Sequence, residues 1–366
     1  RPDARGPGFE RGGFRWLADA SAGAWLAGRL DADWEAPGGH HIVPRGFPAA
    51  LRLFHRLTAD RPVGMSWAAW HAADQRARQT GSWAEAPVDI EERRATWREL
   101  ADAFGVPWRP EITWTEIVLA RSEGSARASA EQAALAAEAH AAGRPWLPQG
   151  SWQWLSRSAQ AELPLLPDGW RPGDVPEGDL GAAESRALAA ALTRATDPDT
   201  RVIAAVWSGW GSLFSSARSR SSIFGRREDG SPLTRGDIRR ANRAVRDEAK
   251  RSTLPRVVER GPRLLLPNRE YLLFSGPLGR LALPEPRGPD AVAGRLPWFT
   301  GSDRDDPEPV ALLWPEDRSW LLVTEIDANN SVLLGDPALL ARVHETPELE
   351  SEVLPEGSLE RWSPAS

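Results

Sequence analysis

The sequence predicts an α+β fold, with a helix-rich N-terminal part and a mixed or antiparallel sheet with flanking helices in the C-terminal part. Helical patterns gather in the first third of the chain, and short apolar runs of strand length follow one another in the second half. Helices and strands do not alternate at the spacing of regular βαβ units. The chain is 41% apolar and 26% charged, which is typical of a globular protein. Its 366 residues are enough for two or three ordinary domains, or for one large domain with insertions.

The N-terminal part is expected to span residues 1–143. Turn formers such as EAPGGHH divide its first 63 residues. Between these turns, Phe14–Leu30 follows a loose helical stripe, and residues 49–57 alternate as a strand does, with His55 on the face of the strand's leucines.

Two clearer helices are expected before residue 105. Ser66 is placed to cap the first, on which Trp67, Trp70 and His71 share a face. The second is predicted to begin at Asp89, in DIEERRATWRELADAFG, and to end at the glycine of that stretch.

A segment rich in proline and glycine, residues 144–180, is expected to cross between two parts as an extended chain. Residues 181–366 then form an α+β C-terminal part with a basic insertion at about 212–251. This part begins with the helical stretch GAAESRALAAALTRAT and closes with a helix capped by Asp336, with Pro337 at its first position. Between these helices lie the expected strands VIAAVW, RLLLPNREYLLFSG, PVALLWP, SWLLVTEID and SVLLG.

Several kinds of chemistry are excluded by composition. The chain has no cysteine, which removes disulfides, thiolate metal sites and a cysteine nucleophile. Lys250 is the only lysine, and no glycine-rich loop precedes it, so a P-loop or Schiff-base chemistry is not expected. His40, His41 and His55 lack chelating spacing, so we predict no metal site and no cofactor.

Nothing in the sequence indicates a membrane or a secretion route. No apolar run approaches the length that spans a bilayer, and the opening RPDARGPGFERGG lacks an apolar signal region. We therefore expect a cytoplasmic protein without a membrane partner.

Charge is unevenly distributed. Residues 201–263 hold fifteen basic and six acidic side chains, whereas residues 303–360 hold three basic and fifteen acidic ones. The simplest interpretation is that these two regions pair within the fold, and the alternative is a basic surface that binds a polyanion.

The basic segment supplies the candidates for polyanion binding. A helix predicted over residues 234–251 carries them on its broad polar face: Arg239, Arg240, Arg243, Arg246 and Lys250. Such a helix is able to lie on phosphates, which makes nucleic-acid association an alternative function. Acidic residues interrupt the basic face, and no aromatic residues are interleaved for base stacking, so a solvated helix tied to the acidic region is the preferred interpretation.

The stretch WPEDRSWLLVTEIDANNSVLLG, residues 314–335, supplies the candidates for carboxylate chemistry. A strand over Trp320–Asp327 would place Glu325 and Asp327 on one face, about 6.6 Å apart. With Asp317 nearby, this arrangement allows a carboxylate-dependent hydrolase with a site near residues 317–327. Two carboxylates at the end of one strand more often mark the place where the strand meets water.

Paired tryptophans are the candidates for ligand binding. Such rings are able to line a groove for a sugar or an aromatic ligand where they are exposed, although 19 tryptophans must mostly belong to the core. The candidate ligand-binding residues are Trp207, Trp210, Trp314, Arg318 and Trp320.

The same C-terminal stretch resembles an uncharacterised family of actinobacterial proteins whose pattern runs W-P-x-D-R-x-W, a short strand, T/S-E-[IV]-D and a turn with glycine. The matching positions here are Trp314, Pro315, Asp317, Arg318, Trp320, Thr324, Glu325, Ile326, Asp327 and Gly335. VPRGFPAALRLFH, AAVWSGWG and PNREYLLFSGPL are similar to further parts of that family. DANNSVLLGD departs from it, since the family tends to have paired glycines there. The resemblance implies a bacterial source and no particular activity.

Together these observations predict a bacterial protein that binds a protein or small-molecule partner without catalysis. Nucleic-acid association through residues 234–251 and carboxylate-dependent hydrolysis are the alternatives.

Overall fold

The computed structural model describes residues 9–11, 13–33, 39–80, 89–103, 165–173, 175–210, 213, 254–267, 269–282, 310–328 and 330–359. Two compact units form, and each combines separate stretches of the chain. Unit 1 takes in Arg1–Trp34 and Ser185–Leu322, and unit 2 takes in Glu35–Glu184 and Val323–Ser366. The α+β class predicted from the sequence is confirmed, and the pairings given below are antiparallel.

The strands of unit 1 lie in the order β1-β2-β9-β7-β10-β11, with β8 also paired to β9. Their bounds are β1 Glu10–Arg11, β2 Phe14–Trp16, β7 Arg201–Trp207, β8 Leu264–Leu266, β9 Arg269–Pro277, β10 Leu312–Pro315 and β11 Leu321–Val323. The helical elements are η1 Ala20–Arg29, α6 Ala182–Ala195, α8 Arg256–Glu259 and η5 Leu278–Ala282. Both α6 and β11 run across the sequence boundary between the units.

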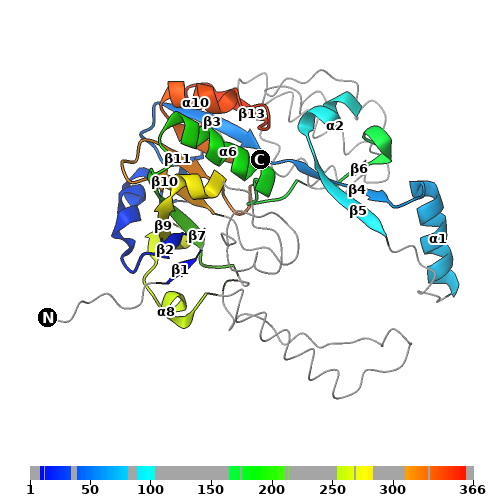
Figure 1. Cartoon of the computed structure of the whole chain (residues 1–366), viewed down its shortest axis with the longest axis horizontal. Helices are drawn as coiled ribbons and strands as arrows, with labels where there is room; N and C mark the ends of the chain where they lie inside the picture. Colours follow the sequence, from blue (N-terminus) through cyan, green and yellow to red (C-terminus); the bar gives the residue numbers. More distant parts are fainter. Residues whose placement is uncertain are drawn as a thin grey trace, which may run out of the picture. The chain divides into compact units, whose positions relative to one another are not determined.

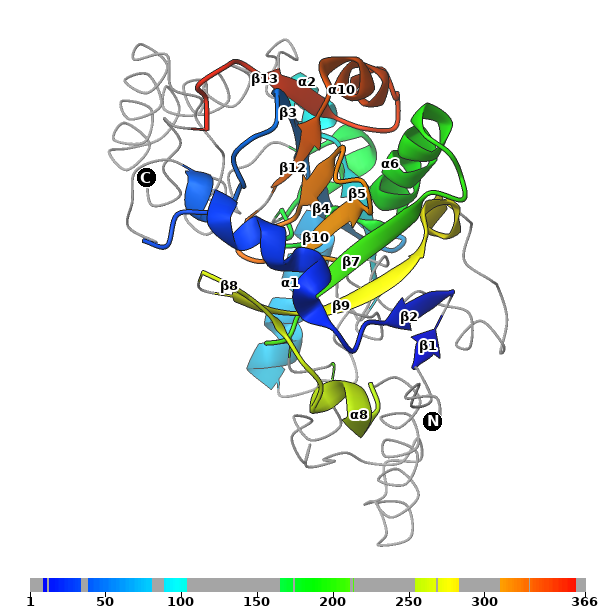
Figure 2. The same cartoon turned by 90° about the vertical axis from the view of Figure 1, so that its left-hand side faces the viewer.

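The central strands of unit 1 follow from apolar runs. In β7 the five residues from Val202 to Val206 are all buried, as expected for a strand covered on both faces. The two helical elements η1 and α6 lie on opposite faces of these strands (Figures 1 and 2). Gly23 of η1 is pressed so closely against β8 that an added Cβ would lie 2.4 Å from Leu264.

Unit 2 contains a sheet part with the order β12-β3-β13 and a separate three-stranded sheet with the order β5-β4-β6. The strand bounds are β3 Ala49–Phe54, β4 Leu57–Pro62, β5 Ile90–Ala95, β6 Arg171–Pro172, β12 Asn330–Gly335 and β13 Ser351–Leu354. The helical elements are η2 Gly39–His41, α1 Trp67–Thr80, α2 Trp97–Ala103, η4 Pro167–Gly169 and α10 Pro337–His344. Only His55 and Arg56 separate β3 from β4, so a continuous segment of the chain contributes one strand to each of the two sheets (Figure 1).

Two predicted helix starts are confirmed. The Asp336 side chain accepts from the backbone N–H of Ala338 at 2.8 Å, and Pro337 is the first residue of α10. The Ser66 hydroxyl accepts from the N–H of Ala69 at 3.3 Å at the start of α1. In both cases the cap satisfies a backbone donor that has no partner inside the helix.

The helix predicted from Asp89 is wrong, because Ile90–Ala95 forms strand β5 against β4. Its charged side chains find partners across the strands, as in the ion pair of Arg61 with Glu91 at 2.6 Å. The helix starts later, at Trp97, where Thr96 and Glu99 form a capping box. The T-x-x-E spacing at Thr96 is the sequence signal that marks this start.

Within the part of the chain that the structure describes, no helix has both the length and the apolar character needed to cross a bilayer.

Candidate functional site

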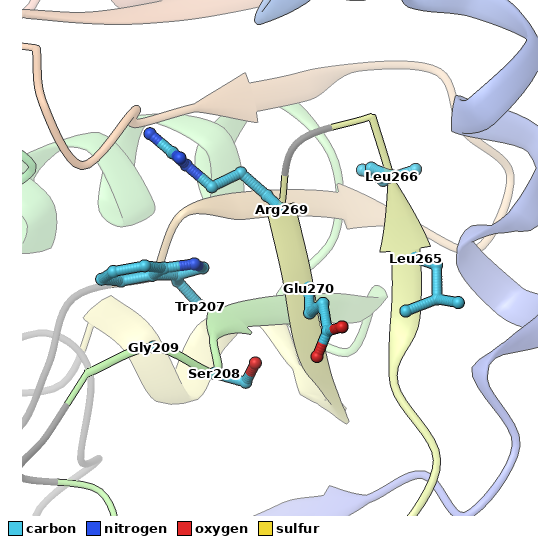
Figure 3. Close-up of a pocket in the computed structure, with 7 residues that line it drawn as sticks. All are labelled: Trp207, Ser208, Gly209, Leu265, Leu266, Arg269 and Glu270. Atoms are coloured by element: carbon cyan, nitrogen blue, oxygen red, sulfur yellow. The ribbon is translucent and has the colours of Figure 1, made fainter. Parts of the chain in front are cut away.

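Unit 1 carries an open hollow of about 510 Å³ at the end of β7, next to the end of β8 and the start of β9 (Figure 3). Trp207, Ser208 and Gly209 line it from the end of β7. The hairpin contributes the remaining lining residues, Leu265, Leu266, Arg269 and Glu270. These segments are about sixty residues apart in sequence, and the pairing of β7 with β9 brings them together.

Trp207 is held in place from three sides. Its ring meets Trp210 edge to face, with ring centroids 5.2 Å apart, and the Arg269 guanidinium lies 5.7 Å from its centroid. Gly209 lies directly against it, because an added Cβ there would come within 2.2 Å of the indole. Any larger residue at position 209 must therefore displace the ring.

The hollow has one apolar and one polar part. Leu265 is 65% exposed, an unusual degree for a leucine on a strand. Beside it stand the exposed Glu270 side chain and the half-buried Ser208 (Figure 3). An apolar surface next to a few polar groups is the usual composition of a small-molecule site, and the volume lies in the usual range of about 300–1,000 Å³.

Arg263 stands close to the hollow but is committed elsewhere. Its guanidinium donates to the carbonyls of Val258, Glu259 and Gly261 at 3.1, 2.6 and 2.6 Å, at the end of α8. Burial lowers the pKa of Arg263, and the nearby charges of Glu270 and Glu259 oppose that shift.

The candidate ligand-binding tryptophans have different surroundings. Trp207 lines the hollow and Trp210 contacts its ring, whereas Trp314 and Trp320 are fully buried in the core. The ring of Trp314 packs against Trp25 at 6.1 Å. A fully buried ring offers no surface to a ligand.

Arg318 does not line the hollow, and its side chain contacts Trp25 instead. It lies in a turn with a left-handed φ of 59°, and its guanidinium stacks over Trp25 at 5.4 Å. Asp317 accepts from the N–H of Ser319 at 3.0 Å, so this carboxylate closes the turn.

The candidate carboxylates Glu325 and Asp327 do not share a strand face. The predicted strand Trp320–Asp327 is wrong in its extent, because β11 ends at Val323 and the chain then turns. The turn is closed by the N–H of Ala328, which donates to the Glu325 carbonyl at 3.0 Å. As a result the Glu325 side chain is buried and that of Asp327 is exposed.

The predicted basic helix, with Arg239, Arg240, Arg243, Arg246 and Lys250, lies outside the described residues. Among the residues that are described, no group of three or more histidines and carboxylates is placed to hold a metal ion.

Unit 2 contains a polar cluster that the sequence did not indicate. His55 Nδ1 lies 2.9 Å from the Pro176 carbonyl, and its Nε2 lies 2.8 Å from Ser331 Oγ. Ser331 Oγ lies 2.8 Å from Thr324 Oγ1. His55, Ser331 and Thr324 are buried, and burial lowers the pKa of His55 to about 4. A serine beside a histidine resembles a nucleophile and its base, but this pair is closed off from solvent and its donors and acceptors satisfy one another.

The chain matches no protein-family model, no curated protein and no solved structure. The fold and the site together define an α+β protein with a solvent-open hollow at the end of β7.

Proposed function

We propose that this protein binds a small amphipathic ligand in the hollow beside Trp207 and does not convert it. The observation that carries the proposal is the joining, at one strand end, of an indole locked in orientation with an exposed leucine and an exposed carboxylate. A fixed aromatic ring gives a large contact area at a small loss of side-chain entropy, which favours recognition.

The lining residues support binding rather than catalysis. None of the seven is a histidine, and within the described chain the Ser208 hydroxyl has no base within hydrogen-bond reach. Arg269 and Trp207 contact each other, so the site is organised before any ligand arrives. Preorganisation of this kind is what a binding site needs.

The experiment is a fragment screen by ligand-observed NMR on the intact chain. Two variants alter the site: Trp207→Ala removes the ring, and Gly209→Ala forces it to move. Gly28→Ala is the matched control, because an added Cβ at this exposed glycine of η1 has nothing within 4 Å.

We expect that some fragments bind both the parent chain and the Gly28→Ala control. The affinity of these fragments should fall at least tenfold in Trp207→Ala and in Gly209→Ala. Thermal unfolding of all three variants checks that each remains folded. Fragments that bind Trp207→Ala as well as the parent, or the absence of any fragment bound near Trp207, would overturn the proposal.

A further inference from the structure

The two sides of strand β9 present different chemistry to the hollow. Successive side chains of a strand point to opposite faces, so Arg269 and Glu270 diverge. Trp207 pairs with Tyr271 across β7 and β9, which places the indole on the Arg269 side. Leu265 pairs with Glu270 across β8 and β9, which places this leucine beside the carboxylate.

The Ser208 side chain lies on the same face as Glu270. Its backbone N–H donates to the Glu270 carbonyl at 2.8 Å, which continues the β7–β9 pairing by one residue. Because Ser208 follows Trp207, its side chain points to the opposite face from the indole. Figure 3 shows the Ser208 hydroxyl and the Glu270 carboxylate on the same side of the strand end.

The Glu270 carboxylate has unused acceptor capacity. In the described part of the chain it takes part in no side-chain hydrogen bond and no ion pair. Two arginines are neighbours of Glu270: Arg263 is directed onto three backbone carbonyls, and Arg269 lies over the indole on the other face. The Ser208 hydroxyl is equally unengaged in the described residues, so two oxygen acceptors stand together beside an exposed leucine.

We infer, building on the proposed function, that the ligand of this hollow is an organic cation: a protonated amine carried on an apolar or aromatic body. An ammonium group has only donors, and it complements a carboxylate and a hydroxyl oxygen that accept no side-chain hydrogen bond from any described residue. The apolar body then covers Leu265, where burial of apolar surface adds to affinity, and extends around the strand end toward Trp207, which lines the same hollow from the other face.

The anionic alternative fits less well. A carboxylate ligand on this side would face Glu270 at short range, and like charges placed together oppose binding. The Arg263 guanidinium is directed onto backbone carbonyls at the end of α8, and the Arg269 guanidinium lies over Trp207 on the other face of the strand. A hydrogen bond to a charged partner is about twice as strong as a neutral one, so the head group should dominate selectivity.

The test uses three probes that share a phenylethyl-sized body and differ in the head group: 2-phenylethylamine, 2-phenylethanol and phenylacetate. Binding is measured by NMR titration of the intact chain at constant salt. We expect the amine to bind at least tenfold more tightly than the alcohol, and phenylacetate to bind more weakly than the alcohol.

Three variants identify the acceptor. Glu270→Gln should reduce amine affinity at least tenfold and leave the alcohol unchanged, and Ser208→Ala should reduce amine affinity a few-fold. Glu259→Gln is the matched control, because it also removes a carboxylate near Arg263 but does not line the hollow. Amine affinity should remain within twofold in this control.

The outcomes separate the two claims. If the alcohol or phenylacetate binds as tightly as the amine, and that binding needs Trp207, the inference fails and the proposed function stands. A preference for the amine that survives in Glu270→Gln also overturns the inference. If no probe shows binding that depends on Trp207, the cation inference falls, and the fragment screen alone then decides the proposed function.

Discussion

His55 and Ser331 share a hydrogen bond of 2.8 Å between Nε2 and Oγ, and its direction follows from the neighbours of both residues. The Pro176 carbonyl is able only to accept, so the Nδ1 of His55 donates to it at 2.9 Å. In a neutral ring Nε2 then accepts from the Ser331 hydroxyl, whose oxygen is free to accept from Thr324 at 2.8 Å. This chain satisfies every polar group only while His55 is neutral.

Stability should therefore fall with acid in a defined window. Burial, the largest cause, lowers the pKa of His55 to about 4 from an ordinary value of 6.5. Above pH 6.5 both the folded and the unfolded states hold the ring neutral. Between pH 6.5 and pH 4 the unfolded chain gains a proton that the folded chain does not, so the free energy of unfolding falls by about 3 kcal/mol.

Urea denaturation at pH 7, 6, 5 and 4 measures this slope. His55→Gln should flatten it over that window, whereas His71→Gln, on the exposed side of α1, should leave it in place. A slope that persists unchanged in His55→Gln would refute the assignment.

A second prediction concerns the ion pair of Arg52 with Glu352, which joins β3 to β13. Arg52 is only 2% exposed, and burial lowers the pKa of its guanidinium. Glu352→Leu leaves this buried cation without its partner, which should cost about 3–5 kcal/mol of unfolding free energy. Adding Arg52→Met should recover most of the loss, because an apolar pair removes the desolvation penalty.

Denaturant titration of the single and the double variant checks this pair. A double variant no more stable than Glu352→Leu would show that the strands need the ion pair itself.

A third prediction concerns the start of α2. The two oxygens of Glu350 accept from the N–H groups of Trp97 and Arg98 at 2.9 and 3.0 Å. Burial raises the pKa of Glu350, and these two donors oppose the rise. Glu350→Ala leaves two helix-terminal donors without acceptors and should cost about 1–2 kcal/mol.

The matched control is Glu348→Ala, since the Glu348 side chain is exposed and its contact with Arg56 uses the backbone carbonyl. Equal losses in the two variants, measured by thermal unfolding, would contradict the capping role.

A fourth prediction concerns the small sheet. Arg171 forms two hydrogen bonds with Asp60, at 3.0 and 2.6 Å, and lies 3.8 Å from the ring centroid of Trp67. A lysine keeps the charge but loses the planar fork and the stacking. Arg171→Lys should therefore lower amide protection in β4 by about 1 kcal/mol, as measured by hydrogen exchange.

Arg78→Lys provides the comparison, because its pair with Asp74 lies on the helix surface and contributes little. Unchanged exchange in Arg171→Lys would show that stacking on Trp67 does not hold the sheet.

Much of the secondary structure of this protein is predictable from local pattern. The run from Val202 to Trp207 is a strand because it is uniformly apolar, and Asp336 begins a helix because it is followed by proline. Such signals act over a few residues, so they need no knowledge of distant chain.

The misassigned segments have a common cause. Ile90–Ala95 has the charge pattern of a helix surface, and it becomes a strand only because β4 supplies backbone partners and opposite charges. Near Glu325, close approach of Gly178 to Ile326 accompanies the turn that ends the strand early; an added Cβ on Gly178 would lie 2.8 Å from the Ile326 backbone. Both causes lie far away in the sequence.

The α+β class, several of the strands and the exclusion of cysteine chemistry can be read from the sequence alone, because periodicity, capping and composition are local properties. Only the tertiary packing leaves Trp207 half-buried at the hollow while it encloses Trp314, and only this packing places Glu270 beside Leu265 and Ser208. The exposure of a side chain and its neighbours depend on which strands pair. Strand pairing joins residues that are far apart in the sequence, and no local pattern indicates which of them will meet.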